Sequence, residues 1–370
     1  MTGKRVVVAM SGGVDSSVAA AILKEQGYQV IGVTMQIWPQ DKQAAGGCCG
    51  LGAVEDARMV AHKLNIPHYV MNFRKIFTQT VIADFYKEYS QGRTPNPCIR
   101  CNQYIKFDVL LHRAKEMDAD FIATGHYGRI KHSPDGYHLL KGVDPGKDQS
   151  YFLYTLGQKE LCHLLLPIGN LHKAEVRKLA AELELPTATS PDSQDICFIP
   201  DGDYRSFIAA YIPLKSGDIV DTHGNIIGRH RGLAAYTVGQ RQGLGLASNR
   251  RLYVIKLDAG SNRLIVGTED QLLSRKLIAC QLNWVSGKAP GVFTGITAKI
   301  RYGSPEVAVK LSPGNGTTEV SFLEPQRAIA PGQAAVFYQG ETVLGGGIIE
   351  ASKTKQEGKY AKHQVATIPC

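Results

Sequence analysis

Apolar, β-branched runs alternate with amphipathic stretches along the first 200 residues of the chain. The runs are short enough for strands buried on both faces, and the amphipathic stretches repeat their apolar positions with helical spacing. Strands alternating with helices of this length predict βαβ units and a parallel, doubly wound sheet. The expected strands cover residues 5–10, 30–37, 68–73 and 121–124, and the expected helices cover residues 17–26, 54–64, 76–89 and 173–183.

The residue pattern changes after residue 210, where short runs rich in β-forming residues are separated by Gly, Pro and Asn. These runs lie at residues 252–257, 264–266, 297–302 and 334–338, and their spacing is typical of small β-barrels. We therefore expect an α/β fold, with a doubly wound parallel-sheet domain followed by two small β-rich, barrel-like domains. The predicted units are a first domain at residues 1–210, a central β-rich domain at 211–277, a C-terminal β-barrel at 278–352 and a polar tail at 353–370.

The composition is that of a globular protein. The 370 residues are 44% hydrophobic and 20% charged, which argues against a disordered or collagen-like chain. No apolar run approaches the roughly 18 residues that a membrane-spanning helix needs, so we expect no membrane protein. The start of the chain has no apolar signal core, and a cytoplasmic location is expected.

The excess of positive charge is concentrated in residues 211–370, the rear of the chain. Residues 1–210 carry 23 Lys and Arg against 22 Asp and Glu, a net charge of +1. The remaining 160 residues carry 19 against 11, a net charge of +8. This division predicts that a polyanion docks mainly on the rear domains, although a merely soluble basic domain would have the same count.

A Gly-rich turn follows the first expected strand and opens a helix. Residues 11–17 read Ser-Gly-Gly-Val-Asp-Ser-Ser, in which the two glycines let backbone N–H groups approach an anion. The helix N-terminus and the hydroxyls of Ser16 and Ser17 add further attraction. Asp15 would face phosphates unfavourably unless Mg²⁺ lies between them. The string contains neither a Gly-Lys-Ser/Thr nor a Gly-x-Gly-x-x-Gly motif.

This string resembles the PP-loop of the ATP pyrophosphatases, which adenylate a substrate and release pyrophosphate. The resemblance implies that ATP binds with Mg²⁺, but it does not identify the substrate, because several unrelated syntheses use the same loop. The positions that match the nucleotide loop are Ala9, Met10, Ser11, Gly12, Gly13, Val14, Asp15 and Ser16.

Three of the eight cysteines lie in polar surroundings, and eight are too few for a disulfide scaffold of this length. Cys98 and Cys101 lie in a polar, Pro-rich loop, in which two prolines are expected to hold an extended segment rigid ahead of the cysteines. Basic neighbours such as Arg100 would lower the pKa of a thiol there and make it a competent nucleophile. Structural zinc is less favoured, because no second pair completes a tetrahedral site. Cys197 is the third, in the string Ser-Gln-Asp-Ile-Cys-Phe-Ile.

The cysteine strings, Asn-Pro-x-x-x-Cys-Asn-x-x-Ile-Lys-Phe and Ser-x-x-Ile-Cys-Phe-Ile, closely resemble those of the bacterial tRNA 2-thiouridylase family. Further matches extend the resemblance over residues 4–350, among them Thr-Gly-His-Tyr at 124–127 and Lys-Asp-Gln-Ser-Tyr-Phe-Leu at 147–153. The resemblance implies an enzyme that uses ATP to adenylate the C2 oxygen of the wobble uridine of tRNA. Sulfur from a cysteine persulfide then displaces AMP and leaves 2-thiouridine.

The resemblance also implies roles for individual residues. Cys197 matches the persulfide carrier, and Cys101 matches the partner that releases the sulfur by forming a disulfide bond. His126 is implied to lie near the reacting centre and the tRNA, although a structural histidine at a strand end would look the same. Met35 and Gly125 match contacts to the adenosine. The segment Asn96, Pro97 and Cys98 matches the surroundings of the target base, and the further matches to tRNA contacts are Lys147, Asp148, Gln149, Arg301, Tyr302 and Gln339. The implied partners are tRNA and a cysteine desulfurase or sulfur-relay protein.

One departure from the family opens an alternative. Many members have Asp at the position of Cys98, and a thiol does not reproduce a carboxylate. Cys98, Cys101 and Cys197 could instead ligate a 4Fe–4S cluster that delivers the sulfur. Rival functions are a tRNA-binding PP-loop protein without turnover and a PP-loop ligase acting on a small metabolite. Cys48 and Cys49, in a Gly-rich loop, are assigned no role.

Overall fold

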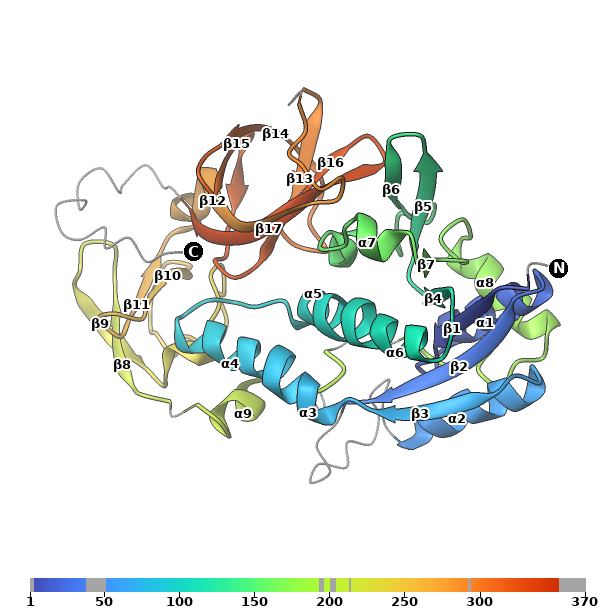
Figure 1. Cartoon of the computed structure of the whole chain (residues 1–370). Helices are drawn as coiled ribbons and strands as arrows, with labels where there is room; N and C mark the ends of the chain where they lie inside the picture. The colour runs from blue at the N-terminus through green and yellow to red at the C-terminus, as the bar shows by residue number, and fades with distance from the viewer. Residues whose placement is uncertain are drawn as a thin grey trace.

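The computed structural model describes residues 3–37, 51–192, 196–199, 204–212, 214–291 and 294–352. Cys48, Cys49 and the predicted tail at 353–370 lie outside the described residues. The described chain forms three β-structures, namely a parallel sheet between helices, a small four-stranded sheet and a barrel (Figure 1). Within these ranges, no helix combines the length and the apolar character that crossing a membrane requires.

The first structure is a five-stranded parallel sheet in the order β3-β2-β1-β4-β7, which confirms the doubly wound α/β prediction. The chain winds outward in one direction from β1 through β2 to β3, and in the other from β4 to β7. Ligands of such sheets bind where the winding reverses, outside the carboxyl ends of the strands, here between β1 and β4. The strands are β1 (Arg5–Ala9), β2 (Gln29–Gln36), β3 (His68–Asn72), β4 (Phe121–Ala123) and β7 (Leu164–Leu165).

Both faces of this sheet are covered by helices, as the alternation of side chains along β1 requires. Val6 and Val8 belong to a core shared with α1 (Val14–Glu25), α2 (Leu51–Lys63) and α8 (Lys173–Glu182). Val7 and Ala9 belong to the opposite core, which two long helical runs cover. The first run is α3 (Arg74–Phe77), η1 (Thr78–Ile82) and α4 (Ala83–Ser90), and the second is α5 (Pro97–Cys101), η2 (Asn102–Val109) and α6 (Leu110–Glu116), with π-helical η1 and η2.

A β-hairpin that the hydrophobic pattern did not predict links the first structure to the last. Its strands, β5 (Gly128–Ser133) and β6 (Gly136–Lys141), follow β4, and β6 pairs with β17 of the barrel at Leu140 and Thr342. The parallel-sheet region and the barrel are therefore joined by backbone pairing (Figure 1). Shorter elements complete the front of the chain, namely η3 (Ser150–Leu153), α7 (Gln158–Leu161) and α9 (Tyr204–Ala209).

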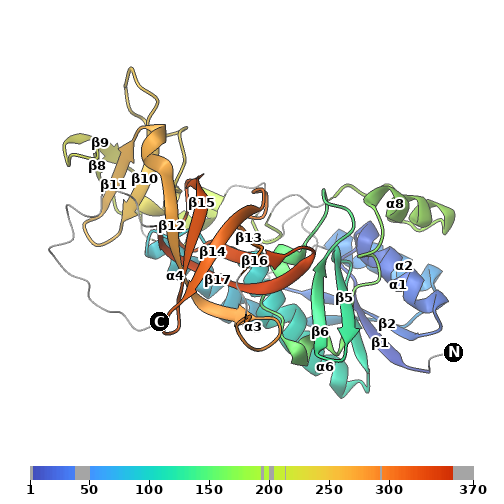
Figure 2. The ribbon, with the colours of Figure 1, turned by 90° about the horizontal axis from the view of Figure 1, so that it is seen from above.

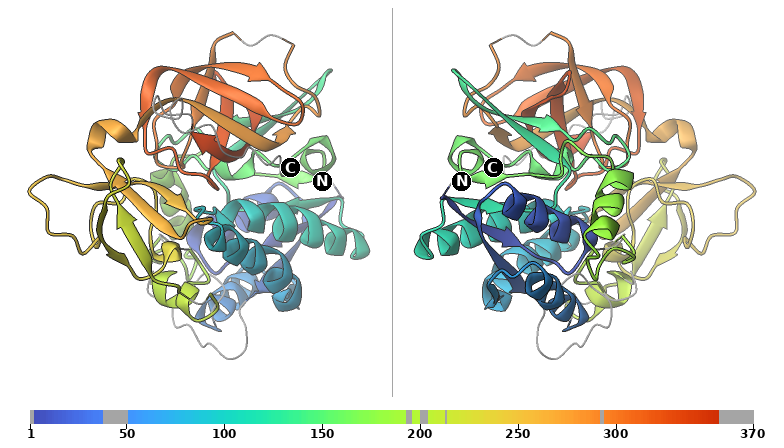
Figure 3. Two further views of the ribbon diagram at one scale, coloured as in Figure 1. Left: turned by 90° about the vertical axis from the view of Figure 1, so that its left-hand side faces the viewer. Right: turned by 90° about the vertical axis from the view of Figure 1, so that its right-hand side faces the viewer.

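The rear of the chain forms the two predicted β-structures, which lie side by side in Figures 2 and 3. The small sheet has the order β10-β11-β8-β9, and six strands close a barrel because β12 pairs with both β15 and β17. β12 already begins at Leu273, before the predicted division near residue 277. The strands are β8 (Gly217–Val220), β9 (Ile226–His230), β10 (Tyr253–Asp258), β11 (Arg263–Gly267), β12 (Leu273–Trp284), β13 (Ile296–Lys299), β14 (Val307–Pro313), β15 (Thr318–Arg327), β16 (Ala334–Gln339) and β17 (Thr342–Ser352), with short 3₁₀ turns η5 (Leu233–Ala235) and η6 (Glu269–Leu272).

Candidate active site at the nucleotide loop

The Gly-rich turn lies between β1 and α1 and is held together by its own hydroxyl groups. The side chains of Ser16 and Ser17 are buried, and both donate to the carbonyl of Gly13, at 3.0 and 2.9 Å. These hydroxyls therefore help to hold the loop in shape, and their predicted contact with an anion stays a prediction. Gly12 has φ +74°, and a Cβ there would lie 2.4 Å from the carbonyl oxygen of Ala53 in α2. Only glycine fits this position without strain.

The end of β4 rests directly on the loop. A Cβ at Gly125 would lie 2.7 Å from both the carbonyl carbon of Asp15 and the nitrogen of Ser16. Gly125 is therefore required for the close approach of two backbone segments, 110 positions apart in sequence. This contact is at the reversal point of the sheet, where α/β folds bind their ligands. Met35, the other position matched to adenosine contacts, lies in β2 and packs partly buried against the core under the two long helical runs.

The carboxylate of Asp15 is paired with side chains that no sequence motif indicated. Nζ of Lys173 donates to both carboxylate oxygens of Asp15, at 2.7 and 2.8 Å, and the hydroxyl of Tyr127 donates to one of them at 2.8 Å. Lys173 is only 9% exposed, whereas the side chain of Asp15 is 33% exposed, so the pair is buried on the lysine side and open to solvent on the carboxylate side. The ammonium group of Lys173 thus binds the carboxylate of Asp15, to which the sequence analysis expected Mg²⁺ to bind.

His126 follows β4 and is buried beneath the second long helical run. Its Nδ1 lies 2.7 Å from the hydroxyl of Thr124, and its ring is 5.9 Å from the ring of Phe107 in η2. Burial, together with the nearby charge of Lys106, holds the pKa of His126 well below its usual range. The imidazole is therefore neutral at physiological pH, so that it can donate or accept one hydrogen bond at each nitrogen.

Cys98 and Cys101 lie in the helix α5 (Pro97–Cys101), so the prediction that they lie in a Pro-rich loop is wrong. Pro97 occupies the start of α5, where a missing N–H costs nothing and the fixed φ suits a helix. The side chain of Asn96 caps this helix by accepting from the N–H of Ile99 at 3.4 Å. Asn96 and Pro97 therefore have structural reasons to occupy these positions, besides their predicted nearness to the target base.

The structure brings Cys197 to the same core as Cys101. Cys101 is buried in this core, and Cys197 packs against it while remaining partly exposed. The neighbouring Phe198 holds the segment in place, since its ring lies 5.5 Å from those of Phe77, Phe85 and Phe207. Two thiols that are 96 positions apart in sequence thus belong to one hydrophobic cluster.

The entrance to α5 is held by the barrel. The N–H of Thr94 donates to the carbonyl of Pro331 at 2.8 Å, and Nε2 of Gln333 donates to the carbonyls of Thr94 and Pro95, at 2.9 and 3.2 Å. A Cβ at Gly332 would lie 2.8 Å from the nitrogen of Thr94. The helix that carries Cys98 and Cys101 is therefore positioned from two sides, by the parallel-sheet region and by the barrel.

The described residues contain no arrangement of ligands for a single metal ion. No group of three or more His, Cys, Asp or Glu side chains within the described ranges is arranged to hold a metal ion, and this includes Cys98, Cys101 and Cys197. A cluster ligated by three cysteines needs all three sulfur atoms directed at one cluster. We therefore derive no chemical step through iron and sulfide.

Predicted tRNA contacts from two regions of the chain meet between the first domain and the barrel. The ring of Tyr302 is 39% exposed and lies 4.4 Å from the ring of Phe152, next to the segment 147–149. Nζ of Lys147 lies 2.7 Å from the carboxylate of Asp192. Asp148 is buried, and its carboxylate accepts from the N–H groups of Gly142 and Ser150 and from the Ser150 hydroxyl, so it organises this turn from within.

The remaining predicted tRNA contacts differ in their surroundings. Gln149 has its side-chain carbonyl bonded to the N–H of Tyr127 at 3.0 Å. The guanidinium of Arg301 donates to the carbonyls of Val238 and Ala328 and so connects the small sheet region with the barrel. Gln339 is exposed at the end of β16 and donates to the carbonyl of Thr294 at 2.9 Å.

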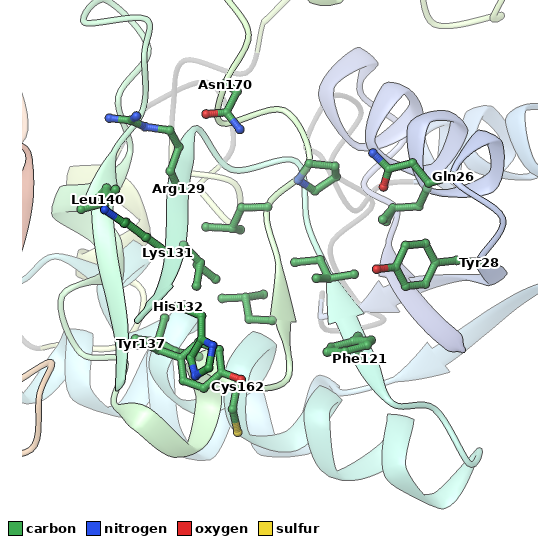
Figure 4. Close-up of a pocket in the computed structure, with 17 residues that line it drawn as sticks. Gln26, Tyr28, Phe121, Arg129, Lys131, His132, Tyr137, Leu140, Cys162 and Asn170 are labelled. Atoms are coloured by element: carbon green, nitrogen blue, oxygen red, sulfur yellow. The ribbon is translucent and has the colours of Figure 1, made fainter. Parts of the chain in front are cut away.

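A cavity of about 520 Å³ lies elsewhere, between the end of α1, the edge of the parallel sheet and the β5–β6 hairpin (Figure 4). Its walls include Tyr28, Phe121, Arg129 and Cys162. None of the predicted site residues lines it. The site that the sequence predicts is therefore distinct from this cavity.

Comparison with known families accounts for nearly the whole chain. Residues 4–201 match the tRNA methyl transferase HUP domain. Residues 205–268 match the tRNA methyl transferase PRC-barrel domain, and residues 274–349 match the aminomethyltransferase β-barrel domain.

Full-length relatives carry one name. The chain is 51% identical to the tRNA-specific 2-thiouridylase MnmA of Acetivibrio thermocellus, over 95% of this chain and 100% of that protein. It is 50% identical to the tRNA-specific 2-thiouridylase MnmA of Halothermothrix orenii, over 94% of this chain and 99% of that protein. Both matches extend over nearly the full length of this chain and of the relative. The chain therefore belongs to the tRNA-specific 2-thiouridylase MnmA family, a family of tRNA sulfurtransferases.

Proposed function

We propose that this protein converts the wobble uridine of tRNA to 2-thiouridine, with ATP as the activating substrate and a persulfide on Cys197 as the sulfur source. The observation that carries the proposal is the close contact between Gly125 and the nucleotide loop, next to the buried His126. Through Phe107, His126 borders the helical run that begins with the Cys101-bearing α5. These contacts support a site in which the nucleotide loop, the neutral imidazole and the two thiols act together.

The first step is activation of the base. The C2 oxygen attacks the α-phosphorus of ATP, the new O–P bond replaces the bond to the β-phosphate, and pyrophosphate leaves. The backbone N–H groups at the start of α1 suit the phosphates. Mg²⁺ enters as part of the MgATP substrate, and Asp15 is the carboxylate available to it once Lys173 exchanges its contact for a phosphate. The neutral His126 donates a hydrogen bond to the charge that develops at the base.

The second step is sulfur transfer. The terminal sulfur of the Cys197 persulfide attacks C2, and AMP leaves with the former C2 oxygen. The Cys101 thiolate then attacks the Cys197 sulfur, which breaks the S–S bond to the base and forms a Cys101–Cys197 disulfide. The transferred sulfur remains as the thiocarbonyl. An external dithiol reductant and a new persulfide from a cysteine desulfurase or relay protein complete the cycle. The common hydrophobic cluster of Cys101 and Cys197 supports this pairing.

The test is mass spectrometry of tRNA nucleosides after incubation with ATP, Mg²⁺, a thiol reductant, and a cysteine desulfurase with cysteine. We expect 2-thiouridine from the wild-type protein and none from Cys197→Ser, which retains tRNA binding. Cys162→Ser is the matched control and should keep full activity, since Cys162 lines the separate cavity. Absence of 2-thiouridine under both aerobic and anaerobic conditions, with every component shown to be active, would refute the proposal. Product that forms only with iron-loaded protein would favour the cluster alternative.

A further inference from the structure

The loop to which we assign the nucleotide contains no cation of its own. Residues 11–17 include neither Lys nor Arg, whereas the triphosphate of ATP carries several negative charges. The N–H groups at the start of α1 offset this charge only in part, since a helix terminus supplies about half of one elementary charge. Expulsion of pyrophosphate is favoured by positive charge placed where the leaving group gains its negative charge. The chain supplies such a charge from α8, in the side chain of Lys173.

All three donors of the Lys173 ammonium group face carboxylate oxygens. Nζ donates to both oxygens of Asp15, at 2.7 and 2.8 Å, and lies 2.9 Å from Oδ1 of Asp192. Two further cations contact the same Asp192 carboxylate, Lys147 at 2.7 Å and Arg177 at 2.8 Å. Both acidic side chains are partly open to solvent. An anion that arrives from solvent therefore competes with these two carboxylates for the Lys173 ammonium group.

The position of Lys173 is unfavourable for stability. It is the first residue of α8, where the helix dipole opposes a positive charge. The residue is also buried, and a buried ion pair seldom stabilises a fold more than apolar side chains of the same size would. The demands of folding alone would favour an apolar or acidic residue here, so the lysine points to a charged ligand.

Helix α8 is held at both ends. At its start, the N–H of Lys173 donates to the carboxylate of Asp144 at 2.9 Å. Beyond its end, the hydroxyl of Thr187 donates to that of Ser17 in α1 at 3.0 Å, and both residues are fully buried. Between these contacts, Val176 is fully buried in the core that α8 shares with α1. The ammonium group is therefore held beside the nucleotide loop before any ligand binds, which is the arrangement that stabilises a transition-state charge most effectively.

We propose that Lys173 is a catalytic residue of the adenylation step, the group that binds the β- and γ-phosphates of ATP and neutralises the departing pyrophosphate. This inference rests on the proposed function, which supplies ATP and the base that it adenylates. When MgATP binds, Asp15 coordinates its Mg²⁺, and the donors of Lys173 move from carboxylate to phosphate oxygens. As the C2 oxygen bonds to the α-phosphorus, the bond from that phosphorus to the bridging oxygen breaks, and its electron pair stays on pyrophosphate. The ammonium group donates hydrogen bonds to this growing charge and keeps its proton.

The first measurement separates the two outer phosphates from the rest of the nucleotide. Isothermal titration of the full-length protein in the presence of Mg²⁺ compares AMP with an ATP analogue whose α–β bridge resists cleavage. We expect Lys173→Met to weaken binding of the analogue roughly tenfold or more, because hydrogen bonds from a charged group are lost, and to change AMP binding little. Lys178→Met is the matched control and should bind both ligands as the wild type does, since Lys178 is an exposed residue of the same helix.

A second variant should change the affinity in the opposite direction. Asp192→Asn leaves Lys173 in place and removes a carboxylate that competes with phosphate for it, so the analogue should bind roughly two- to fivefold more tightly. Combining Asp192→Asn with Lys173→Met should abolish this gain. Asp192→Asn keeps the proposal testable if Lys173→Met folds poorly, because a merely structural ion pair would give weaker binding, or no change, in Asp192→Asn as well.

The second measurement follows pyrophosphate release in a single turnover with tRNA and saturating ATP. Loss of one donor to a transition-state charge typically lowers a rate by about 10²–10³, and we expect a loss of this size in Lys173→Met, with tRNA affinity unchanged. Equal losses of affinity for AMP and the analogue, or pyrophosphate release at the wild-type rate, would overturn the role of Lys173. A wild-type protein that binds the analogue but does not thiolate tRNA would instead refute the proposed function.

Discussion

Among single residues, His126 depends most strongly on its surroundings for its chemistry. The family resemblance could not separate a reacting imidazole from a structural one at a strand end. Burial beside Thr124, Phe107 and Lys106 now gives it a neutral ring at physiological pH. The same burial makes His126 a source of pH-dependent stability, because the unfolded chain takes up a proton that the folded chain resists.

We predict that the free energy of unfolding falls as the pH is lowered below about 6.5, the pKa of an unfolded histidine. Between that pH and the lower pKa of folded His126, the unfolded state binds more protons, so acid favours unfolding; above it the effect vanishes. His126→Gln should reduce the slope by up to about 1.4 kcal/mol per pH unit. Urea titrations from pH 7.5 to 5.5 measure this slope. His68, whose pKa is also lowered, remains in both proteins and supplies the residual slope. An unchanged slope in the variant would contradict the assignment.

On the scale of secondary-structure elements, the site is made by contacts between segments that are distant in sequence. The end of β4 lies on the first turn of α1, and the barrel turn at residues 331–333 holds the entrance to α5. Both contacts need a glycine or a particular hydrogen bond, so both are sensitive to single substitutions.

We expect Gly125→Ala to weaken ATP binding roughly tenfold, because overpacking against the loop backbone costs about 1–3 kcal/mol. The new Cβ would lie 2.7 Å from the backbone of Asp15 and Ser16 and displace the nucleotide loop. Isothermal titration with the ATP analogue measures the dissociation constant. Gly260→Ala is the control, since its Cβ would meet only the Asp258 side chain at 3.5 Å. Equal affinities for ATP in both variants would show that the β4 contact does not shape the loop.

Gln333→Leu should lower the free energy of unfolding by about 1–3 kcal/mol, because two backbone carbonyls lose their donor. The entrance to α5 loosens, so we also expect slower thiolation in single-turnover reactions while tRNA binding changes little. Gln326→Leu is a matched control, since Gln326 only donates to the carbonyl of Glu324 on an exposed part of β15. A Gln333→Leu protein that is destabilised but reacts at the wild-type rate would limit the barrel contact to a structural role.

For the whole molecule, the nucleotide loop and the excess of basic charge lie in different regions. The parallel-sheet region holds the nucleotide loop and the described cysteines of the site, and residues 1–210 are nearly neutral. Residues 211–370 carry a net charge of +8, of which +3 lies in residues 353–370 and +5 in the part of the chain that contains the small sheet and the barrel. The β6–β17 pairing connects the two regions. A basic rear of this kind suits the phosphates of tRNA, whose binding releases counterions.

The affinity for tRNA should therefore fall steeply with salt, and the slope should depend on charges in the rear half. Arg250 and Arg251 are adjacent and exposed in the small-sheet region. Replacing both by Ala should reduce the slope of log Kd against log salt by roughly one for each phosphate that the variant no longer neutralises. Arg113→Ala with Lys115→Ala removes two charges from exposed positions of α6 and should leave the slope unchanged. Filter binding from 50 to 200 mM salt, approximately the range over which such binding weakens strongly, compares them. Equal slopes would reject the rear half as the docking surface.

Local sequence patterns predicted the features of the fold that depend on neighbouring residues. The spacing of hydrophobic residues and the positions of glycines predicted the parallel strands, the loop after β1 and the β-rich domains after residue 210. These features depend on residues that are neighbours in sequence. The cysteine strings identified the family. The same local patterns predicted a Pro-rich loop around Cys98 and Cys101 where the structure has α5, since Pro97 suits both a loop and a helix start.

Tertiary structure alone decided which distant groups meet. Lys173 lies 158 positions from Asp15, and no local pattern connects a lysine at the start of one helix with a carboxylate in another turn. The β5–β6 hairpin, the barrel's hold on α5 and the charges around Asp192 are of the same kind. The sequence by itself determined the chemistry available to this protein, its elements and the distribution of its charge. The fold decided which charges neutralise one another and which thiols share a cluster, because those contacts depend on distances in space that sequence separation does not encode.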